Sequence, residues 1–305
     1  MSLPFKYGIV NVDEGELKAL DQYCQKEESD EFIVVTDNII YHQNYTGNYK
    51  EIQLNSLTKV FSATAIGLLL KEKHLDTLHT PLKSIFPSLS NDPKKDITIW
   101  HILTHTSGIK TLGHDMELIS ADSCLEYVLS LELDSEPGLV SQYNNEAVSL
   151  IAGIVKRLSG EPLDMYLAKR IFTPLEINNW QWLRDKSGTP FSHWGLELTG
   201  IDLAKFAQLY IDNGIWQGQR LLPEKWVRES TNASQNINRS WGYLWLRYRD
   251  QIGNYKGYGM SGSQGKHLYI DHNNNSFAIR LVHRKKGRET PPADNFFEYA
   301  VKLLS

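Results

Sequence analysis

Ser56 and Lys59 stand three residues apart at the start of a long apolar stretch, a spacing that suits covalent catalysis. A serine hydroxyl is a poor nucleophile until a neighbouring base accepts its proton, and a lysine three residues later on a helix projects from the same face. The pattern therefore predicts that Ser56 attacks an ester or amide carbonyl and becomes acylated, while Lys59 helps to remove its proton.

The same Ser-x-x-Lys spacing occurs twice more, at 107–110 and 263–266. Both copies carry glycine inside the motif and lie in a loop or near a strand, so stacking of serine on lysine is not assured there. Residues 56–73, in contrast, form a helix pattern with apolar side chains on almost every face, which predicts burial on all sides. The positive end of this helix would favour negative charge that develops near Ser56.

Sheet patterns lie at both ends of the chain, and helical patterns lie between them. The β-rich runs at 31–36 and 39–42 flank an Asp-Asn pair and predict a hairpin. The later predicted elements are amphipathic helices at 145–158 and 200–213, strands at 241–248, 267–270 and 276–283, and a closing helix at 293–304.

This order predicts an α/β (α+β) fold in which the two termini complete one antiparallel sheet flanked by helices. We expect a single catalytic domain over 1–305, with a sheet subdomain at 1–55 and about 236–305 and an inserted, mostly helical subdomain at about 56–235. The active site should lie where these two parts meet.

Trp241, Tyr243 and Trp245 would share one face of the strand predicted at 241–248. Such a face either lines a substrate cleft or packs between the sheet and the helices. The sequence favours neither alternative.

Several longer segments resemble the serine β-lactamase and penicillin-binding protein family, most closely its class C β-lactamase and serine esterase branch. They are Ser-Leu-Thr-Lys at 56–59, ITIWHILTHTSGI at 97–109, the segment 143–177 that begins YNNEAVSLIAGIV, and the segment 195–227 that begins GLELTGIDLAKF. Their order and spacing also match. The resemblance implies a β-lactamase/transpeptidase-like fold and an acyl-enzyme mechanism without a metal or organic cofactor.

The family's second motif, Tyr-x-Asn, is matched by residues 143–145. By this resemblance, Tyr143 is the phenol that shuttles the proton. Asn145 is the amide that contacts both Lys59 and the region of the substrate carbonyl.

The family's third motif, Lys-Thr-Gly or His-x-Gly on an edge strand, is where this sequence departs from the pattern. Met260 replaces the basic residue, Ser261 replaces the hydroxyl residue, and Gly262 remains. The resemblance places the oxyanion hole at the backbone amides of Ser56 and Ser263. It assigns 260–262 to substrate binding, although Met260 cannot pair with a substrate carboxylate.

Two other catalytic chemistries receive little support. His101 and His105 are four residues apart on a predicted helix, which suits two metal ligands, but no glutamate follows His101 as in His-Glu-x-x-His. We expect both histidines to form hydrogen bonds with the backbone instead. The Gly-x-Ser-x-Gly motif of α/β-hydrolases is absent from the sequence.

Composition and charge argue against a nucleic-acid-binding protein, a zinc or disulfide framework and a membrane-spanning protein. The 305 residues carry 32 basic and 36 acidic side chains, a net charge of -4, without a basic stripe for nucleic acid. The densest basic run, 284–288, is expected to be a solvated loop. Cys24 and Cys124 are too far apart for a zinc or disulfide motif, which predicts buried thiols. The sequence lacks an apolar run of about 20 residues that would span a membrane.

The cellular compartment depends on what precedes the first residues. Residues 1–7 lack the charged and apolar regions of a secretion signal, so the chain as written predicts a cytoplasmic protein. A signal peptide removed from the sequence would place it in the periplasm or outside the cell.

Three functions fit these residues. The first is an esterase or amidase for uncharged acyl groups, with weak or no β-lactamase activity. The second is a true β-lactamase or D-alanyl peptidase, which requires another cation in the cleft, such as Lys256, Lys266 or Arg280. The third is a non-catalytic module that recognises cell-wall fragments. The intact Ser56, Lys59 and Tyr143 argue against the third, because binding alone needs no proton relay.

Overall fold

The computed structural model describes residues 4–283 and 294–305. Its helices are α1 (Glu14–Lys26), α2 (Thr58–Lys71), α3 (Leu82–Ile85), α4 (Ile99–Leu103), α5 (Met116–Ser120), α6 (Cys124–Ser130), α7 (Asn145–Ser159), α8 (Leu163–Leu167), α9 (Gly200–Ile211), α10 (Glu224–Thr231) and α11 (Phe296–Leu304). Shorter turns are the 3-10 helices η1 (Asn55–Leu57), η2 (Pro87–Leu89) and η3 (Pro93–Asp96), and the π-helix η4 (Ala168–Phe172).

A seven-stranded sheet joins the two ends of the chain in the order β1-β3-β2-β12-β11-β10-β9. Its strands are β1 (Lys6–Tyr7), β2 (Glu31–Thr36), β3 (Ile39–Asn44), β9 (Leu246–Arg249), β10 (Tyr255–Gly262), β11 (Lys266–Asp271) and β12 (Ser276–Leu281). Neighbouring strands are antiparallel except for β1 and β3. The predicted sheet built from both termini is therefore confirmed.

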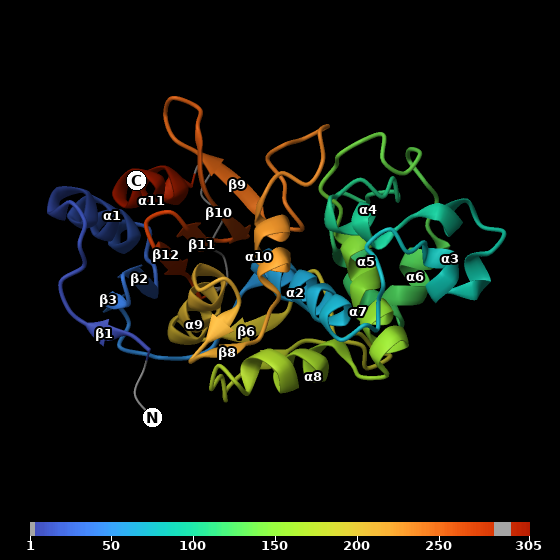
Figure 1. Ribbon diagram of the computed structural model, residues 1–305, viewed down its shortest axis with the longest axis horizontal. Coiled ribbons are helices and arrows are strands. Elements are labelled where there is room, and N and C mark those ends of the chain that lie inside the picture. Colours follow the sequence, from blue (N-terminus) through green and yellow to red (C-terminus); the bar gives the residue numbers. More distant parts are fainter. Residues whose placement is uncertain (1–3, 284–293) are drawn as a thin grey trace.

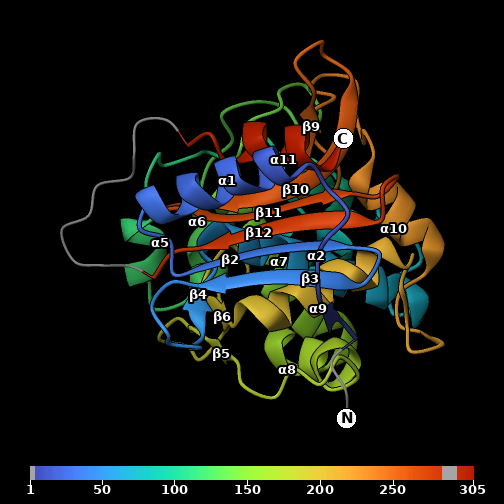
Figure 2. The same ribbon diagram turned by 90° about the vertical axis from the view of Figure 1, so that its left-hand side faces the viewer.

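Helices cover both faces of this sheet. In Figure 2, α1 and α11 lie together on the face turned toward the viewer, and α2, α7 and α9 lie behind it. Helices α3 to α6 gather with α7 on the side away from the sheet (Figure 1). Helix α2 contacts α7, and the turn η1 that precedes α2 contacts β10 and β11 of the sheet.

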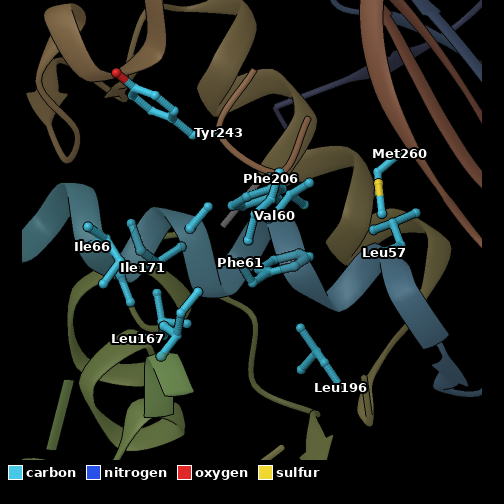
Figure 3. Close-up of a cluster of buried hydrophobic side chains, with 14 of the residues drawn as sticks. Leu57, Val60, Phe61, Ile66, Leu167, Ile171, Leu196, Phe206, Tyr243 and Met260 are labelled. Atoms are coloured by element: carbon cyan, nitrogen blue, oxygen red, sulfur yellow. The ribbon is translucent and has the colours of Figure 1, made fainter. Parts of the chain in front are cut away.

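Local sequence explains most of these elements. The β2–β3 hairpin turns at Asp37 and Asn38, which both have the positive φ that suits these residue types (48° and 65°). Helix α2 is buried at every position from Thr58 to Leu69, as its all-round apolar pattern predicts. Within the core, Phe61 stacks on Phe206 of α9 with ring centroids 3.9 Å apart (Figure 3).

Small sheets fix the connections within the middle section. Strand β6 (Leu196–Leu198) pairs with both β4 (Ile52–Gln53) and β5 (Gln181–Trp182), and β7 (Ile215–Trp216) pairs with β8 (Gln219–Arg220). The β4–β6 pair ties the chain immediately before Ser56 to the middle section.

The prediction of a strand over 241–248 is wrong in its first half. Strand β9 begins at Leu246, and the residues before it form a turn in which Leu244 has a φ of 60°. Trp241 and Trp245 therefore do not share a strand face. Trp245 is fully buried in the core, whereas Trp241 lies beside the ring of Tyr143.

Other expectations can be compared with the described residues. Cys24 and Cys124 are buried free thiols, as expected. The basic run at 284–288 lies outside the described residues. In the part of the chain that the structure describes, no helix combines the length and the apolar character needed to cross a bilayer.

Candidate active site

Ser56 lies in the 3-10 turn η1, directly before α2, and Lys59 lies in the first turn of α2. The Lys59 side chain is 0% exposed, and its ammonium donates a hydrogen bond to the carbonyl oxygen of His193 at 2.9 Å. A buried cation needs such an acceptor, because desolvation otherwise penalises the charge. Ser56 is only partly buried, so the serine is accessible to solvent while Lys59 lies in the interior.

The ring of Tyr143 lies beside this lysine. The Lys59 Nζ atom is 4.9 Å from the centroid of the Tyr143 ring, and the tyrosine is 38% exposed. This approach is a cation–π contact between the Lys59 ammonium and the Tyr143 ring. The structure thus brings together Lys59 and Tyr143, which are 84 positions apart by their numbers in the sequence.

Two aromatic neighbours hold the Tyr143 ring. The ring centroid lies 4.9 Å from that of His105 and 6.0 Å from that of Trp241, and the rings of His105 and Trp241 are themselves 4.7 Å apart. The Nδ1 atom of His105 accepts a hydrogen bond from the backbone amide of Asn144 at 3.3 Å. His101 Nδ1 likewise accepts from the amide of Thr98. Both histidines bond to the backbone as expected, and His105 also packs against a candidate catalytic residue.

Two buried imidazoles, those of His105 and His193, lie close enough to Lys59 to feel its charge. Burial, followed by the nearby charge of Lys59, lowers the pKa of His105 to about 3 and holds the pKa of His193 well below its usual value. Both rings are therefore neutral at pH 7 and add no positive charge to that of Lys59. The Nε2 atoms of both rings are buried without a hydrogen-bond partner among the described residues.

Asn145 differs from expectation in its contacts. It is the first residue of α7, whose N-cap is the side chain of Asn144. Its Nδ2 atom donates to Asp115 Oδ1 at 2.7 Å, and the hydrogen bond of Lys59 goes to His193 instead. The Oδ1 atom of Asn145 is buried without a partner among the described residues. The expected contact between Lys59 and Asn145 is thus replaced by two others, and a catalytic role for Asn145 stays a prediction.

The end of β10 lies against the turn that carries Ser56. A Cβ atom at Gly262 would lie 2.1 Å from the carbonyl oxygen of Leu54, so only glycine fits at this crossing. Asn55 bonds to the next residue, because its Nδ2 atom donates to Ser263 O at 2.9 Å and to Ser263 Oγ at 2.8 Å. These contacts place Ser263 beside Ser56, where the predicted oxyanion hole needs it.

Met260 faces away from any open surface. It is 1% exposed and belongs to the same core cluster as Leu57, and Figure 3 shows the two side chains next to each other. The expectation that Met260 lines the substrate-binding surface is not met, because alternation along β10 turns its side chain into the core. Ser261, one position further, is partly exposed and points to the opposite face.

Sequence reasoning missed Asn55 and His193 as neighbours of the site, and it left open whether Trp241 lines a cleft or packs in the core. Asn55 carried a weak signal, since asparagine is among the residues that tolerate a positive φ, here 51°. His193 carried none, because its place depends on a contact with Lys59 in a distant part of the chain.

Asn55 supplies the first testable prediction. Asn55→Ala should lower kcat for an ester substrate roughly tenfold, because Ser263 loses the bonds that hold its amide beside Ser56. Asn55→Gly is the matched variant, since glycine keeps the positive φ and removes only the hydrogen bonds. Steady-state kinetics with thermal unfolding would separate the effects, and a wild-type kcat in Asn55→Gly would contradict this role.

Comparison with known proteins decides the family. The family model described as Beta-lactamase matches residues 52–301. The chain belongs to this family. The match covers both the Ser56 turn and the closing strands of the sheet, and it confirms the resemblance seen in the sequence.

Members of the family align at low identity. Penicillin-binding protein 4 of Amycolatopsis lactamdurans is 25% identical over 72% of this chain and 68% of its own length. A beta-lactamase of Yersinia enterocolitica is 22% identical over 64% of this chain and 56% of its own length. The chain thus spans only part of these relatives.

Solved structures share the fold. The structure titled "Putative 6-aminohexanoate-dimer hydrolase from Bacillus anthracis" superposes with a TM-score of 0.79 at 20% identity, covering 92% of this chain and 82% of that one. This agreement confirms the β-lactamase/transpeptidase-like fold expected from the sequence. Family membership also confirms the expected class of the protein, a serine hydrolase.

Proposed function

We propose that this protein hydrolyses uncharged esters or amides through an acyl-enzyme at Ser56, with weak or no β-lactamase activity. One observation carries the proposal: Lys59 is fully buried, 4.9 Å from the ring centre of Tyr143, in the first turn after Ser56. A binding module has no need for a buried cation in that place, and a serine nucleophile does.

Each step then has a residue to perform it. Ser56 Oγ attacks the carbonyl carbon while its proton passes to the oxygen of Tyr143, which acts as the general base beside Lys59. The negative oxygen of the tetrahedral intermediate accepts hydrogen bonds from the amides of Ser56 and Ser263. The intermediate collapses, and Tyr143 returns the proton to the departing alcohol or amine. A water molecule then attacks the acyl-serine by the same route and regenerates Ser56.

The cations around β10 support an uncharged substrate. Met260, in the position of the family's basic residue, is apolar and buried. Arg280 is paired with Asp294 at 2.8 Å on the face of the sheet covered by α1 and α11. Lys266 is 1% exposed, and Lys256 lies 3.8 Å from Asp250 at the other end of β10. A substrate carboxylate would therefore gain little from these side chains.

A direct comparison of substrates tests the proposal. The protein should hydrolyse a neutral short-chain p-nitrophenyl ester with a kcat/KM at least about tenfold above that for nitrocefin, whose carboxylate lacks a cationic partner. A hydrogen bond to a charged group contributes about 1.5–3 kcal/mol, roughly tenfold to a hundredfold in affinity. Steady-state assays, with mass spectrometry of Ser56 after a fluorescent penicillin, give both rate and adduct.

The alternatives predict different results. Nitrocefin hydrolysis as efficient as ester hydrolysis would favour a true β-lactamase, and release of D-alanine from peptides would favour a D-alanyl peptidase. Binding of these compounds without turnover or acylation of Ser56 would favour the recognition module.

A further inference from the structure

A chain of hydrogen bonds runs from β10 to the start of α11. Ser261 Oγ lies 3.0 Å from His267 Nδ1, and His267 Nε2 lies 2.6 Å from Asp294 Oδ2. Arg280 Nη1 donates to the same Asp294 oxygen at 2.8 Å, while the hydroxyl of Tyr23 donates to Asp294 Oδ1 at 2.9 Å. Asp294 is therefore held by donors on both of its oxygens.

These donors keep Asp294 ionised. Burial acts to raise the pKa of its carboxyl, but the contacts with His267, chiefly their hydrogen bond, and the charge of Arg280 outweigh burial and hold the pKa well below its usual range. A carboxylate without a proton can only accept. His267 Nε2 must therefore carry the hydrogen of the bond to Asp294, which leaves Nδ1 as a bare acceptor in the neutral ring.

The surroundings of His267 keep the ring neutral and fixed. Its ring stacks on Phe296 of α11, with centroids 5.2 Å apart, and meets Phe297 edge-on at 4.9 Å. Burial lowers the pKa of His267, and the charges of Arg280 and Lys266 act in the same direction, while Asp294 opposes them. Because Nδ1 carries no hydrogen, the Ser261 hydroxyl donates its hydrogen to His267. The Ser261 oxygen can then only accept hydrogen bonds from other groups.

Ser261 lies on the unpaired edge of β10, one residue before the crossing of Gly262 with the turn that carries Ser56. The pairing of β9 with β10 ends at Gly259, so residues 260–262 have no partner in β9 on that edge. This edge leads to Ser263, which Asn55 holds beside the Ser56 turn. Ser261 is partly exposed, whereas His267 behind it is buried.

We propose that the chain Ser261–His267–Asp294–Arg280 makes the Ser261 hydroxyl a fixed acceptor, so that the site prefers uncharged substrates bearing an N–H or O–H donor and rejects carboxylates at this point. The inference rests on the proposed hydrolase function and specifies its substrate class. A substrate carboxylate would face the lone pairs of the Ser261 oxygen without receiving a hydrogen bond. A substrate amide N–H would donate a hydrogen bond to the same oxygen.

Three matched p-nitrophenyl esters test this preference. Their acyl chains have the same length and end in a carboxamide, a methyl ester or a carboxylate. For the wild-type protein, kcat/KM should be about fivefold to tenfold higher for the carboxamide than for the methyl ester, the effect of one hydrogen bond, and lowest for the carboxylate.

Two variants separate the hydrogen-bond chain from simple packing. His267→Phe keeps a ring against Phe296 and frees the Ser261 hydroxyl to donate, so the carboxamide-to-carboxylate ratio should fall at least about fivefold. Ser261→Ala removes the acceptor, and the carboxamide and methyl ester should then react at similar rates. His42→Phe is the matched control, because His42 is also buried beside a carboxylate, Glu31 at 3.1 Å, in the same sheet.

The outcomes separate this substrate preference from the proposed hydrolase function. A purely structural role of His267 would lower stability and all three rates together, as in His42→Phe, and an unchanged ratio would overturn the proposal. Equal wild-type rates for the three esters would overturn it as well, while leaving the hydrolase function intact. Absence of turnover and of Ser56 acylation with every ester would overturn both.

Discussion

Replacing Ser56 with alanine should lower kcat/KM for a neutral ester by on the order of 10⁴-fold or more, as loss of a catalytic serine does in other hydrolases. The variant lacks the oxygen that forms the acyl-enzyme. Because Ser56 is only partly buried in a short turn, the substitution leaves the core around α2 unchanged. Thermal unfolding should therefore match that of the wild-type protein.

The chain offers a matched control for this experiment. Ser107 begins another Ser-x-x-Lys sequence, but it is 1% exposed and its Oγ accepts a hydrogen bond from the amide of Ile109 at 3.3 Å. Ser107→Ala should keep the wild-type rate. Labelling with a fluorophosphonate, followed by mass spectrometry, should find the adduct on Ser56. An adduct on Ser107 or Ser263 with Ser56 unmodified would refute the assignment of the nucleophile.

Local patterns in the sequence were enough to predict the elements that carry the site. The all-round apolar pattern after Ser56 predicts a buried helix, and α2 is buried along most of its length. The Asp-Asn pair predicts the hairpin between β2 and β3. In each case the signal is a periodicity or a turn preference within a few residues, which needs no knowledge of the rest of the fold.

Contacts between distant segments could not be predicted in this way. Lys59 bonds to the carbonyl of His193, 134 positions later, and a backbone carbonyl leaves no mark in the sequence. Similarly, Asn145 bonds to Asp115 through a loop whose path depends on tertiary packing. The failed strand at 241–245 has a related cause, since its aromatic residues suit a strand but pack into the core from a turn.

The bond between Ser261 and His267 depends on strand register. These residues are direct partners across β10 and β11, so their side chains lie on the same face. A shift of the pairing by one residue would turn His267 to the opposite face and away from Asp294. The sequence alone does not show that Ser261, His267 and Asp294 are connected, because their contacts depend on this register.

Removing the hydroxyl of Tyr143 should cost on the order of a hundredfold in kcat, the usual effect of losing a general base. In Tyr143→Phe the ring still packs against His105 and Trp241, so only the proton-carrying oxygen is lost. We therefore expect little change in KM or in thermal stability, together with slower acylation of Ser56 in a single-turnover assay. Lys59→Ala should lower kcat at least as much, because it removes the buried ammonium that lies beside both Ser56 and the Tyr143 ring.

The control for this loss is a tyrosine outside the site. Tyr49 is exposed, and Tyr49→Phe should retain the wild-type kcat. If Tyr143→Phe also retained it, the proton of Ser56 would have to pass to Lys59 directly. In that case Lys59→Ala would lower kcat although Tyr143→Phe does not. The 4.9 Å contact between the Lys59 ammonium and the Tyr143 ring would then hold the ring in place and would not activate its hydroxyl.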